Sequence, residues 1–428
     1  MSLPFGRVNM IGLGYIGLPT AVMLANCGIQ TTGVDINPEV VDIVNRGEIH
    51  IVEPGLEQLV HHVVAKKLLR ASTTPEAADA FIIAVPTPFK GDHEPDLAFV
   101  EAAARSIAPL LQKGNLVILE STSPVGTTEK IAEWLAEART DLSFPQQVGI
   151  AADVNIAYCP ERVLPGKILT ELVTNDRVVG GLTIKCAEQA IHLYQQFVKG
   201  ECIVTNARTA EMCKLTENSY RDTNIAFANE LSIICDKFGI SVWELIQLAN
   251  HHPRVNILQP GPGVGGHCIA VDPWFIVSQA PDDTQLIRSA RAVNNRKPRW
   301  VIQKVQVAIA QILQQQPQKT AKDVKIACFG LAFKPDIDDL RESPALEITK
   351  EIASAHPGDV LVVEPNISVL PSSLIDLVKK VDADDAIKQA DILLLLVDHQ
   401  PFRAMKMMMA AMAADMKKII DTRGAWLA

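Results

Sequence analysis

The chain has 428 residues and a formal net charge of −9; 48% of its residues are hydrophobic and 21% are charged. This length allows two or three domains, and the composition is that of a globular protein, which excludes a disordered chain. The acidic balance argues against a nucleic-acid-binding surface but is compatible with a local basic pocket for a phosphorylated ligand.

The N-terminal segment predicts a dinucleotide-binding βαβ unit. It lacks the apolar region and cleavage site of a secretory signal, so we expect a cytoplasmic protein. GLGYIG, residues 12–17, lies between an apolar strand and a helix, and the next strand ends at Asp35. Such glycines allow a tight turn and close approach to a pyrophosphate at the helix N-terminus. The expected cofactor contacts here are Gly12, Gly14, Tyr15, Ile16, Gly17 and Asp35.

Asp35 indicates which cofactor this unit binds. Its carboxylate can accept hydrogen bonds from ribose hydroxyls and repels a 2′-phosphate, so we expect NAD rather than NADP. A turn that only packs a helix on a strand would explain the glycines but not Asp35.

Further strand signals extend this unit to residues 1–206, which we interpret as one doubly wound parallel domain. The segments AVPTP and ESTSPVG place Pro86, Thr87 and Thr122 at the carboxyl edge of the expected sheet, where ligands of such folds bind. On their own these residues are more typical of ordinary turns than of a ligand site. The further apolar strands are expected at 80–88, 115–124 and 154–161.

The middle of the chain, residues 207–313, is predicted to be helical. Apolar residues recur there at three- and four-residue intervals, and residues 207–238 predict one long helix with an apolar face that suggests a homodimer. Lys214 and Asn218 lie four residues apart on it and therefore share a face, which without other evidence is an ordinary solvated face.

A polar linker at 314–323 precedes a second alternating pattern of strands and helices at 322–428. Its most apolar run, at 392–397, is far too short to span a bilayer and is expected to be a buried strand. The fold class we predict is α/β, with two Rossmann-like doubly wound domains joined by a helical middle section with one long central helix.

Cys268 lies in GVGGHCIAVDP, residues 263–273, and the residues alone leave its role open. The 8 cysteines are scattered, with no CxxC pair and no zinc-like spacing, so we expect reduced thiols and no metal site. Most such cysteines are buried and behave as small hydrophobes. Cys268 is therefore either a core thiol or a nucleophile.

Seven motifs occur in an order and spacing that resemble the nucleotide-sugar 6-dehydrogenase family, which includes UDP-glucose and GDP-mannose dehydrogenases. The resemblance covers essentially the whole chain and implies a dehydrogenase that oxidises C6 of a UDP-sugar to a carboxylate with two NAD in succession. In that reaction a cysteine thiolate adds to the aldehyde, and the resulting thioester is hydrolysed. The motifs are GLGYIG, AVPTP, STSPVG, CPE, KLTEN, GGHCIAVD and LAFKPDIDDLRESPA.

The resemblance also implies roles for individual residues. Cys268 would be the nucleophile, Lys214 and Asn218 would stabilise the alkoxide and later oxyanions, and Glu161 would be a general acid/base acting through a water that Thr122 helps to hold. Asp272 would orient Lys214 or that water. Arg341 would lie near the cofactor. The implied substrate contacts are Glu161, Arg162, Val163, Lys214, Asn218, Arg254, Gly265, Gly266, His267 and Lys334.

The substrate is narrowed by further resemblance. GEIHIVEPGL, PFKGDHEPD and PERVLPGK are similar to the branch of the family that oxidises UDP-N-acetyl-D-mannosamine for bacterial surface polysaccharide. Glucose-specific members usually carry a second glutamate four residues after the one in CPE, and here that position is Pro165. This difference fits another sugar pocket.

Three alternatives remain open at this point. UDP-N-acetylglucosamine 6-dehydrogenases carry similar motifs, and no residue here can be shown to read C2 of the sugar. A protein that binds NAD or a nucleotide sugar without catalysis would not need Cys268, Lys214, Asn218 and Glu161 together. A two-electron hydroxyacid dehydrogenase would leave Cys268 without a task.

Overall fold

The computed structural model describes residues 5–91, 93–266, 268–414 and 417–427. The chain divides into two compact units. The first comprises Met1–Glu217 and Trp274–Gln279, and the second comprises Asn218–Pro273 and Ala280–Ala428.

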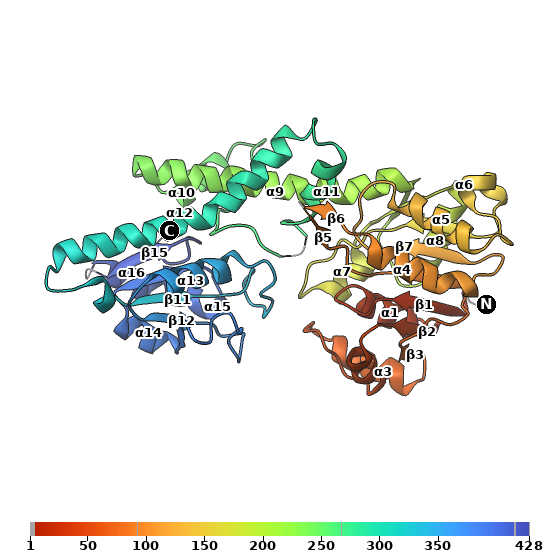
Figure 1. Cartoon of the computed structure of the whole chain (residues 1–428), viewed down its shortest axis with the longest axis horizontal. Coiled ribbons are helices and arrows are strands. Elements are labelled where there is room, and N and C mark those ends of the chain that lie inside the picture. Colours follow the sequence, from red (N-terminus) through yellow and green to blue (C-terminus); the bar gives the residue numbers. More distant parts are fainter. Residues whose placement is uncertain (1–4, 92, 267, 415–416, 428) are drawn as a thin grey trace. The chain divides into compact units, whose positions relative to one another are not determined.

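The first unit is built on an eight-stranded sheet with the order β10-β9-β8-β7-β4-β1-β2-β3 (Figure 1). All neighbouring strands are parallel except β8 and β9. A small β5–β6 hairpin lies outside this sheet. The strands are β1 (Arg7–Ile11), β2 (Gln30–Val34), β3 (Leu69–Ser72), β4 (Ala80–Ile83), β5 (Phe89–Lys90), β6 (Glu94–Pro95), β7 (Leu116–Leu119), β8 (Asn155–Tyr158), β9 (Arg177–Gly181) and β10 (Cys202–Asn206).

The antiparallel β8–β9 pair corrects the prediction of a wholly parallel domain. Residues 159–176 contain helix α7, so in the sequence they look like a crossover between parallel strands. In the structure β9 begins beyond the carboxyl end of β8 and runs back along it, pairing Tyr158 with Gly180. The loop that follows β8 therefore stays at the carboxyl edge of the sheet.

Helices cover both faces of this sheet, which explains why its central strands are apolar without alternation. In β4, Ile82 packs into the core beneath α1, α3 and α8, whereas Phe81 and Ile83 pack into the core beneath α4 and α5. The helices of this unit are α1 (Gly17–Asn26), α2 (Pro38–Asn45), α3 (Leu56–Ala65), α4 (Ala98–Ile107), α5 (Thr127–Ala138), α6 (Pro145–Val148), α7 (Ile168–Thr174) and α8 (Ile184–Tyr194).

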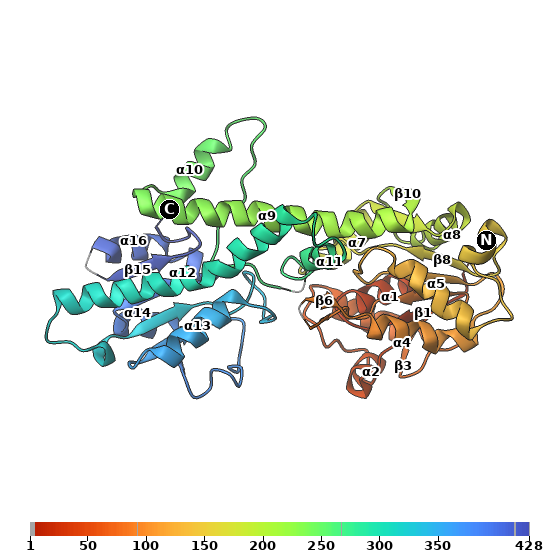
Figure 2. The same ribbon diagram turned by 45° about the horizontal axis from the view of Figure 1, so that its top comes forward.

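The predicted long helix is confirmed as α9 (Ala207–Phe238), which starts in the first unit and continues into the second. In the second unit it lies beside α12 (Gln285–Gln315) (Figure 2). Buried polar side chains join the two helices, among them Asp222 with Arg291 at 2.6 Å. Because α12 continues to Gln315, it covers the first two residues of the predicted 314–323 linker. The shorter helices are α10 (Val242–Ala249) and α11 (Asp272–Gln279).

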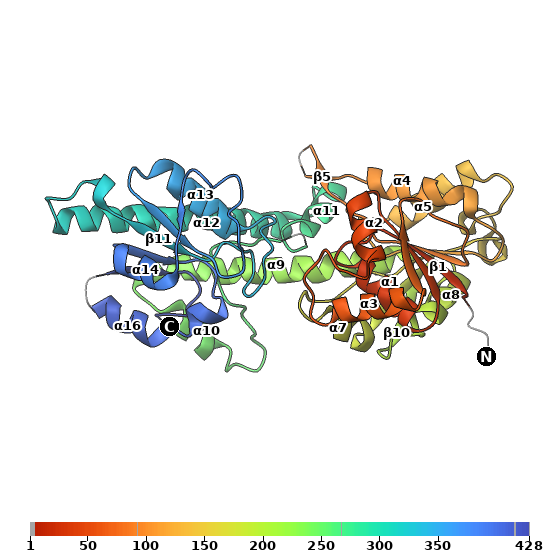
Figure 3. The same cartoon turned by 90° about the horizontal axis from the view of Figure 1, so that it is seen from below.

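The second unit also contains a five-stranded parallel sheet with the order β13-β12-β11-β14-β15. Its central strand β11 is labelled in Figure 3. The run at 392–397 is a buried strand followed by buried Leu396 and Val397, as predicted. In the described ranges, none of the helices combines the length and apolar character that a membrane crossing needs. The elements of this sheet and its helices are β11 (Ile326–Phe329), α13 (Pro344–Ala355), β12 (Val360–Val363), β13 (Lys379–Lys380), α14 (Ala383–Gln389), β14 (Ile392–Leu395), α15 (Gln400–Arg403), α16 (Lys406–Ala414) and β15 (Lys418–Asp421).

Candidate active site

The glycine turn after β1 has the backbone geometry of a pyrophosphate cradle. Gly12 has φ of +96°, and a Cβ there would lie 2.9 Å from the carbonyl carbon of Ala84. A Cβ on Gly17 would collide with the carbonyl oxygen of Gly12. At Gly14 nothing lies within 4 Å of where a Cβ would be, so this backbone faces open space at the start of α1. A dinucleotide pyrophosphate fits this combination of a tight turn and an open approach.

Asp35 follows β2 directly and its carboxylate is directed to this turn. Its Oδ2 accepts a hydrogen bond from the N–H of Leu13 at 3.0 Å, and its Oδ1 accepts one from Asn37 N–H at 2.9 Å. These bonds fix the carboxylate beside the glycine turn, as the sequence predicts for a residue that binds a ribose diol.

Replacing Asp35 by Ala is expected to lower kcat/KM for NAD about 10- to 100-fold, because a charged hydrogen bond to the ribose is lost. The ratio of kcat/KM for NAD to kcat/KM for NADP should also fall, because the carboxylate that repels the 2′-phosphate is removed. Initial rates with both cofactors measure this. Asp42→Ala, at an exposed position on α2, is the matched control and should change neither value. Comparable kcat/KM for NAD and NADP in the wild type would show that the ribose-binding residue is misplaced.

The carboxyl ends of β4 and β7 are joined by side chains, which brings Thr87 and Thr122 together as predicted for one edge of the sheet. The Thr87 hydroxyl donates to the carbonyl of Thr122 at 2.7 Å. Ser121 accepts from Val85 N–H at 2.9 Å. Pro86 lies between these contacts, and the edge as a whole borders the glycine turn because β4 is the neighbour of β1.

Glu161 lies in the loop after β8 and is buried with two donors on its carboxylate. Arg177 donates to Oε2 at 2.9 Å, and the N–H of Arg162 donates to Oε1 at 2.6 Å. Lys214, from α9, donates to the main-chain carbonyl of Glu161 at 2.6 Å. The Lys214 side chain thus meets the main chain of Glu161, although 53 residues separate the two.

The neighbours of Glu161 have specific environments. The Arg162 guanidinium pairs with Glu217 at 2.7 Å. Val163 is half-buried and packs its side chain against the core of the first unit. Arg254 is exposed in the loop after α10, and His267 lies outside the described residues.

In the second unit, Asn218 and Asp272 are in direct contact. Asn218 Nδ2 donates to Asp272 Oδ2 at 2.5 Å, and both residues are buried. Asp272 is the first residue of α11, and its N–H donates to the carbonyl of Cys268 at 2.8 Å. A short path of hydrogen bonds therefore connects the Cys268 turn to α9.

Cys268 differs from the other cysteines in its exposure. It is exposed, whereas four of the 8 cysteines are buried and three are half-buried. Burial raises the pKa of the Cys159 and Cys328 thiols to about 12, which keeps them protonated and unreactive. An accessible thiol is what a nucleophile requires, and the exposure of Cys268 does not fit a core thiol. Its role as nucleophile stays a prediction.

The glycines before Cys268 pack against the loop that follows β11. A Cβ at Gly265 would collide with the carbonyl oxygen of Glu342, and the N–H of Gly266 donates to the carbonyl of Arg341 at 3.2 Å. The same loop carries half-buried Lys334. The Arg341 side chain pairs with Asp339 at 2.5 Å. The structure thus brings the Cys268 segment next to the loop with the two predicted cations.

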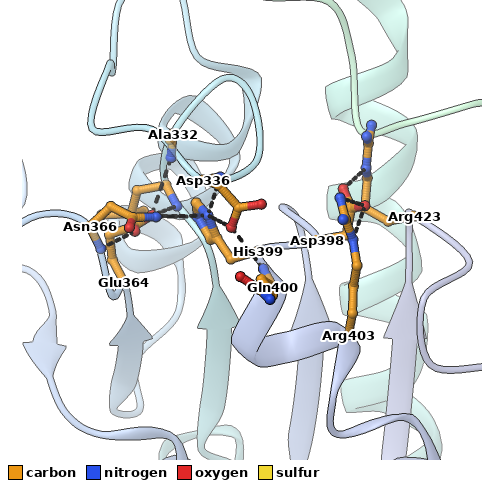
Figure 4. Close-up of polar contacts among 10 residues, drawn as sticks. Ala332, Asp336, Glu364, Asn366, Asp398, His399, Gln400, Arg403 and Arg423 are labelled. Carbon is orange, nitrogen blue, oxygen red and sulfur yellow. Dashed lines mark hydrogen bonds and ion pairs between the residues drawn. The ribbon is translucent and has the colours of Figure 1, made fainter. Parts of the chain in front are cut away.

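The C-terminal sheet repeats the geometry of the Asp35 turn. Gly330 follows β11 with φ of +92°, and the N–H of Leu331 donates to Glu364 Oε2 at 2.7 Å, as Leu13 does to Asp35. Glu364 also meets His399 at 3.1 Å (Figure 4). Burial opposes the charge of Glu364, but hydrogen bonds from His399 and from backbone N–H groups hold its pKa below the usual value.

The contacts of His399 define its tautomer. Nδ1 accepts from the N–H of Asp336 at 2.9 Å, and a backbone N–H can only donate, so the proton is on Nε2 and is donated to Glu364. Asp336 lies in the loop that carries Lys334. A neutral imidazole therefore clamps this loop to the acid at the end of β12.

His399→Phe is expected to destabilise the protein by about 2–4 kcal/mol, because it leaves buried Glu364 without its side-chain donor and Asp336 N–H without its acceptor. Urea denaturation measures this. His399→Gln, whose amide can donate and accept, should recover part of the loss. Equal stability of the Phe variant and the wild type would contradict the clamp.

Sequence reasoning missed three buried residues that hold the site loops in place. Glu53 accepts from Gly166 and Ile168 N–H at 2.7 and 2.8 Å and so anchors the loop after Glu161. Glu211 accepts from Gly126 and Thr128 N–H at 2.6 and 2.8 Å and ties α9 to the loop after β7. The third is Arg177. The one feature of the local sequence that could have indicated any of these three residues is the position of Glu211, about one helical turn before Lys214 on α9.

Comparison with known proteins decides the family. Residues 6–198 match the NAD binding domain of the UDP-glucose/GDP-mannose dehydrogenase family, 208–296 match its central domain, and 327–427 match its UDP binding domain. The chain belongs to this family. It is therefore a member of a dehydrogenase family with an NAD-binding and a UDP-binding domain, as the motifs predicted.

Individual relatives match over the full length. A UDP-N-acetyl-D-mannosamine dehydrogenase of Yersinia pestis is 63% identical over 426 residues, 99% of this chain and 100% of the relative. An NDP-N-acetyl-D-galactosaminuronic acid dehydrogenase of Ralstonia solanacearum is 57% identical and covers 100% of this chain and 98% of the relative. The structure of a UDP-D-ManNAc dehydrogenase from Pyrococcus horikoshii superposes with a TM-score of 0.86 at 38% identity, covering 98% of this chain and 96% of that one.

Proposed function

We propose that this protein oxidises C6 of UDP-N-acetyl-D-mannosamine to the carboxylate, in two NAD-dependent hydride transfers, in the cytoplasm. The observation that carries the reaction type is the exposed Cys268, linked through Asp272 to Asn218 of α9. The choice of sugar is supported by the full-length likeness to UDP-N-acetyl-D-mannosamine dehydrogenases.

The cofactor would be held by the Gly12–Gly17 turn and Asp35, and NAD bound there supplies a two-electron hydride acceptor. Oxidation of an alcohol to a carboxylate removes four electrons, so the protein must hold an intermediate between the two hydride transfers. Thr87 and Thr122, at the neighbouring strand ends, would border the nicotinamide. Arg341 would act near the cofactor.

Cys268 would form that intermediate covalently. Its sulfur forms a bond to C6 of the aldehyde, which gives a thiohemiacetal whose C6–H can leave as the second hydride. The resulting thioester is cleaved by water, which forms the C–O bond of the carboxylate and returns the thiol. Lys214 and Asn218, four residues apart on α9, would stabilise the alkoxide and the tetrahedral oxyanions by charge and by amide donation.

Glu161 would act as the general base on the hydrolytic water, with Thr122 helping to hold that water. Because Pro165 stands where glucose-specific members carry a second glutamate, one carboxylate in this loop must do that work. The sugar and diphosphate would be held by the remaining predicted contacts, among which Gly265 and Gly266 allow close backbone approach. Those contacts are Arg162, Val163, Arg254, His267 and Lys334.

A substrate panel tests the proposal. Purified protein with NAD is offered UDP-N-acetylmannosamine, UDP-N-acetylglucosamine, UDP-N-acetylgalactosamine and UDP-glucose separately, with kcat/KM measured and the product identified by mass spectrometry. We expect the manno sugar to give the highest kcat/KM and UDP-glucose to be poor. UDP-glucose turned over as fast as any acetamido sugar would overturn the choice of substrate.

A second candidate substrate is a nucleotide-linked N-acetylgalactosamine, which the likeness to the Ralstonia solanacearum protein favours. The two sugars differ in configuration at C2 and C4, so the same panel separates them. A higher kcat/KM for the galacto sugar would replace the manno assignment while leaving the reaction unchanged.

We also propose that the protein is a homodimer that pairs through α9. Tyr220, Phe227 and Ile234 lie at seven-residue intervals on this helix and are 64%, 50% and 43% exposed. Such a stripe of large apolar side chains is typical of a surface that is covered in the assembled protein. Light scattering of the wild type against Phe227→Glu tests it: the variant should be monomeric.

A further inference from the structure

A buried cluster in the first unit places one arginine between two glutamates. Arg177, at the start of β9, donates to Glu161 Oε2 at 2.9 Å and lies 3.6 Å from Glu120 Oε1 at the end of β7. The Tyr194 hydroxyl donates to the same Glu120 oxygen at 3.1 Å, and the Arg177 guanidinium lies over the Tyr194 ring. All four side chains are buried.

The charges of this cluster do not balance if both glutamates are ionised. One guanidinium can neutralise one carboxylate, and Glu161 is the one that makes the hydrogen bond to it. Burial, together with the charge of Glu161, raises the pKa of Glu120 to about 8 against the opposing effects of Arg177 and Tyr194. At neutral pH Glu120 is therefore protonated, and the Arg177 charge belongs to Glu161.

Other groups around the cluster keep their charge near this pH. Burial raises the pKa of Cys159 to about 12 and that of Tyr194 well above its usual value, and burial also raises the pKa of Cys202. Beyond them, Arg162 is paired with Glu217, and Lys214 donates to the carbonyl of Glu161. Glu120 is thus the group whose loss of a proton near this pH changes the net charge of the cluster.

We propose that Arg177 is a positioning residue for Glu161 and that the protonation state of Glu120 controls how firmly Arg177 holds it. With Glu120 neutral, the guanidinium is bonded to Glu161 and aims its carboxylate. When Glu120 releases its proton to solvent, a second carboxylate competes for the same guanidinium and weakens that hold. The inference rests on the proposed role of Glu161 as general base.

The test compares the pH dependence of wild type, Glu120→Gln and Arg177→Lys. With UDP-N-acetylmannosamine and saturating NAD, we expect wild-type kcat to fall several-fold as pH rises through about 8, and Glu120→Gln to keep its kcat over that range. Arg177→Lys, which retains the charge but not the fork of donors, should lose about 10-fold or more in kcat with KM changed less than about threefold. Tyr194→Phe preserves the ring over Arg177 and should retain the fall.

A second readout does not depend on activity. Because the pKa of Glu120 is raised in the folded state, the stability that its neutral form contributes is present at low pH and is lost between about pH 4.5 and 8. The melting temperature of Glu120→Gln relative to wild type should therefore increase over that interval and level off above pH 8. A constant difference would overturn the protonation of Glu120.

The two readouts separate the possible failures. If no nucleotide sugar is oxidised, the proposed function falls, and the melting curves still test whether Glu120 holds its proton. If sugar is oxidised but wild-type and Glu120→Gln kcat profiles superimpose, Glu120 does not control Glu161 and the inference is wrong.

Discussion

Cys268→Ala should lower the rate of carboxylate formation by about 10³-fold or more while the first, reversible oxidation persists. In the proposed mechanism the variant lacks the sulfur that converts the aldehyde into a species able to donate a second hydride, but it retains Lys214 and Asn218, to which the proposal assigns stabilisation of the alkoxide. Little NADH should accumulate unless hydroxylamine traps the aldehyde, in which case about one NADH per sugar is expected from the two-electron limit of one alcohol oxidation. Absorbance at the NADH band with product analysis measures both.

Cys202→Ala is the matched control, since this thiol is half-buried and lies on β10, away from the Cys268 turn in the sequence. It should form carboxylate at the wild-type rate. Slow residual carboxylate from the Cys268 variant is consistent with oxidation of the hydrated aldehyde. Full-rate formation of two NADH per sugar by Cys268→Ala would return Cys268 to the class of structural thiols.

Lys297→Met should raise the free energy of unfolding at pH 7 by about 2–4 kcal/mol. Lys297 lies on α12, is 2% exposed and donates to the hydroxyl of Ser232 on α9. Burial lowers its pKa to about 7; Asp236 opposes this shift and Lys304 adds to it. A thioether of similar volume removes the cost of burying an amine that would be charged in water.

The sign of the pH dependence follows from the lowered pKa. Between about pH 7 and 10.5 the unfolded state binds the proton that folded Lys297 has released, so wild-type stability rises with pH over that interval. In Lys297→Met this rise should be absent. Denaturant titrations at pH 7 and pH 9.5 measure it, with Lys350→Met, at an exposed position on α13, as control. A Met variant that is less stable than wild type at both pH values would contradict the argument.

Local sequence patterns predicted those elements whose bounds depend mainly on the residues within them. The bounds of α9 follow from its apolar periodicity, and the position of Asp35 at the end of β2 follows from the glycine motif. The direction of β9 did not follow, because a short helix between strands looks the same whether the next strand runs parallel or antiparallel. Strand direction depends on where the loop returns to the sheet, which no local pattern contains.

The candidate site was predictable residue by residue only through family resemblance. The contacts of Lys214 with Glu161 and of Asn218 with Asp272 span 53 and 54 residues, and nothing in either segment indicates its partner. The likeness between the Asp35 and Glu364 turns was hidden because GLGYIG and GLAFKP share only their first glycine and leucine. The two turns share their backbone geometry although the C-terminal turn lacks the second and third glycines of GLGYIG.

The stoichiometry of NADH in the wild type tests whether C6 loses four electrons through Cys268. UDP-N-acetylmannosamine is made limiting with NAD in excess, and NADH and uronate are counted at completion. Because two hydrides leave C6 through a thiohemiacetal on Cys268, the expected result is two NADH and one carboxylate per sugar. One NADH per sugar with the aldehyde as the final product would contradict the four-electron reaction.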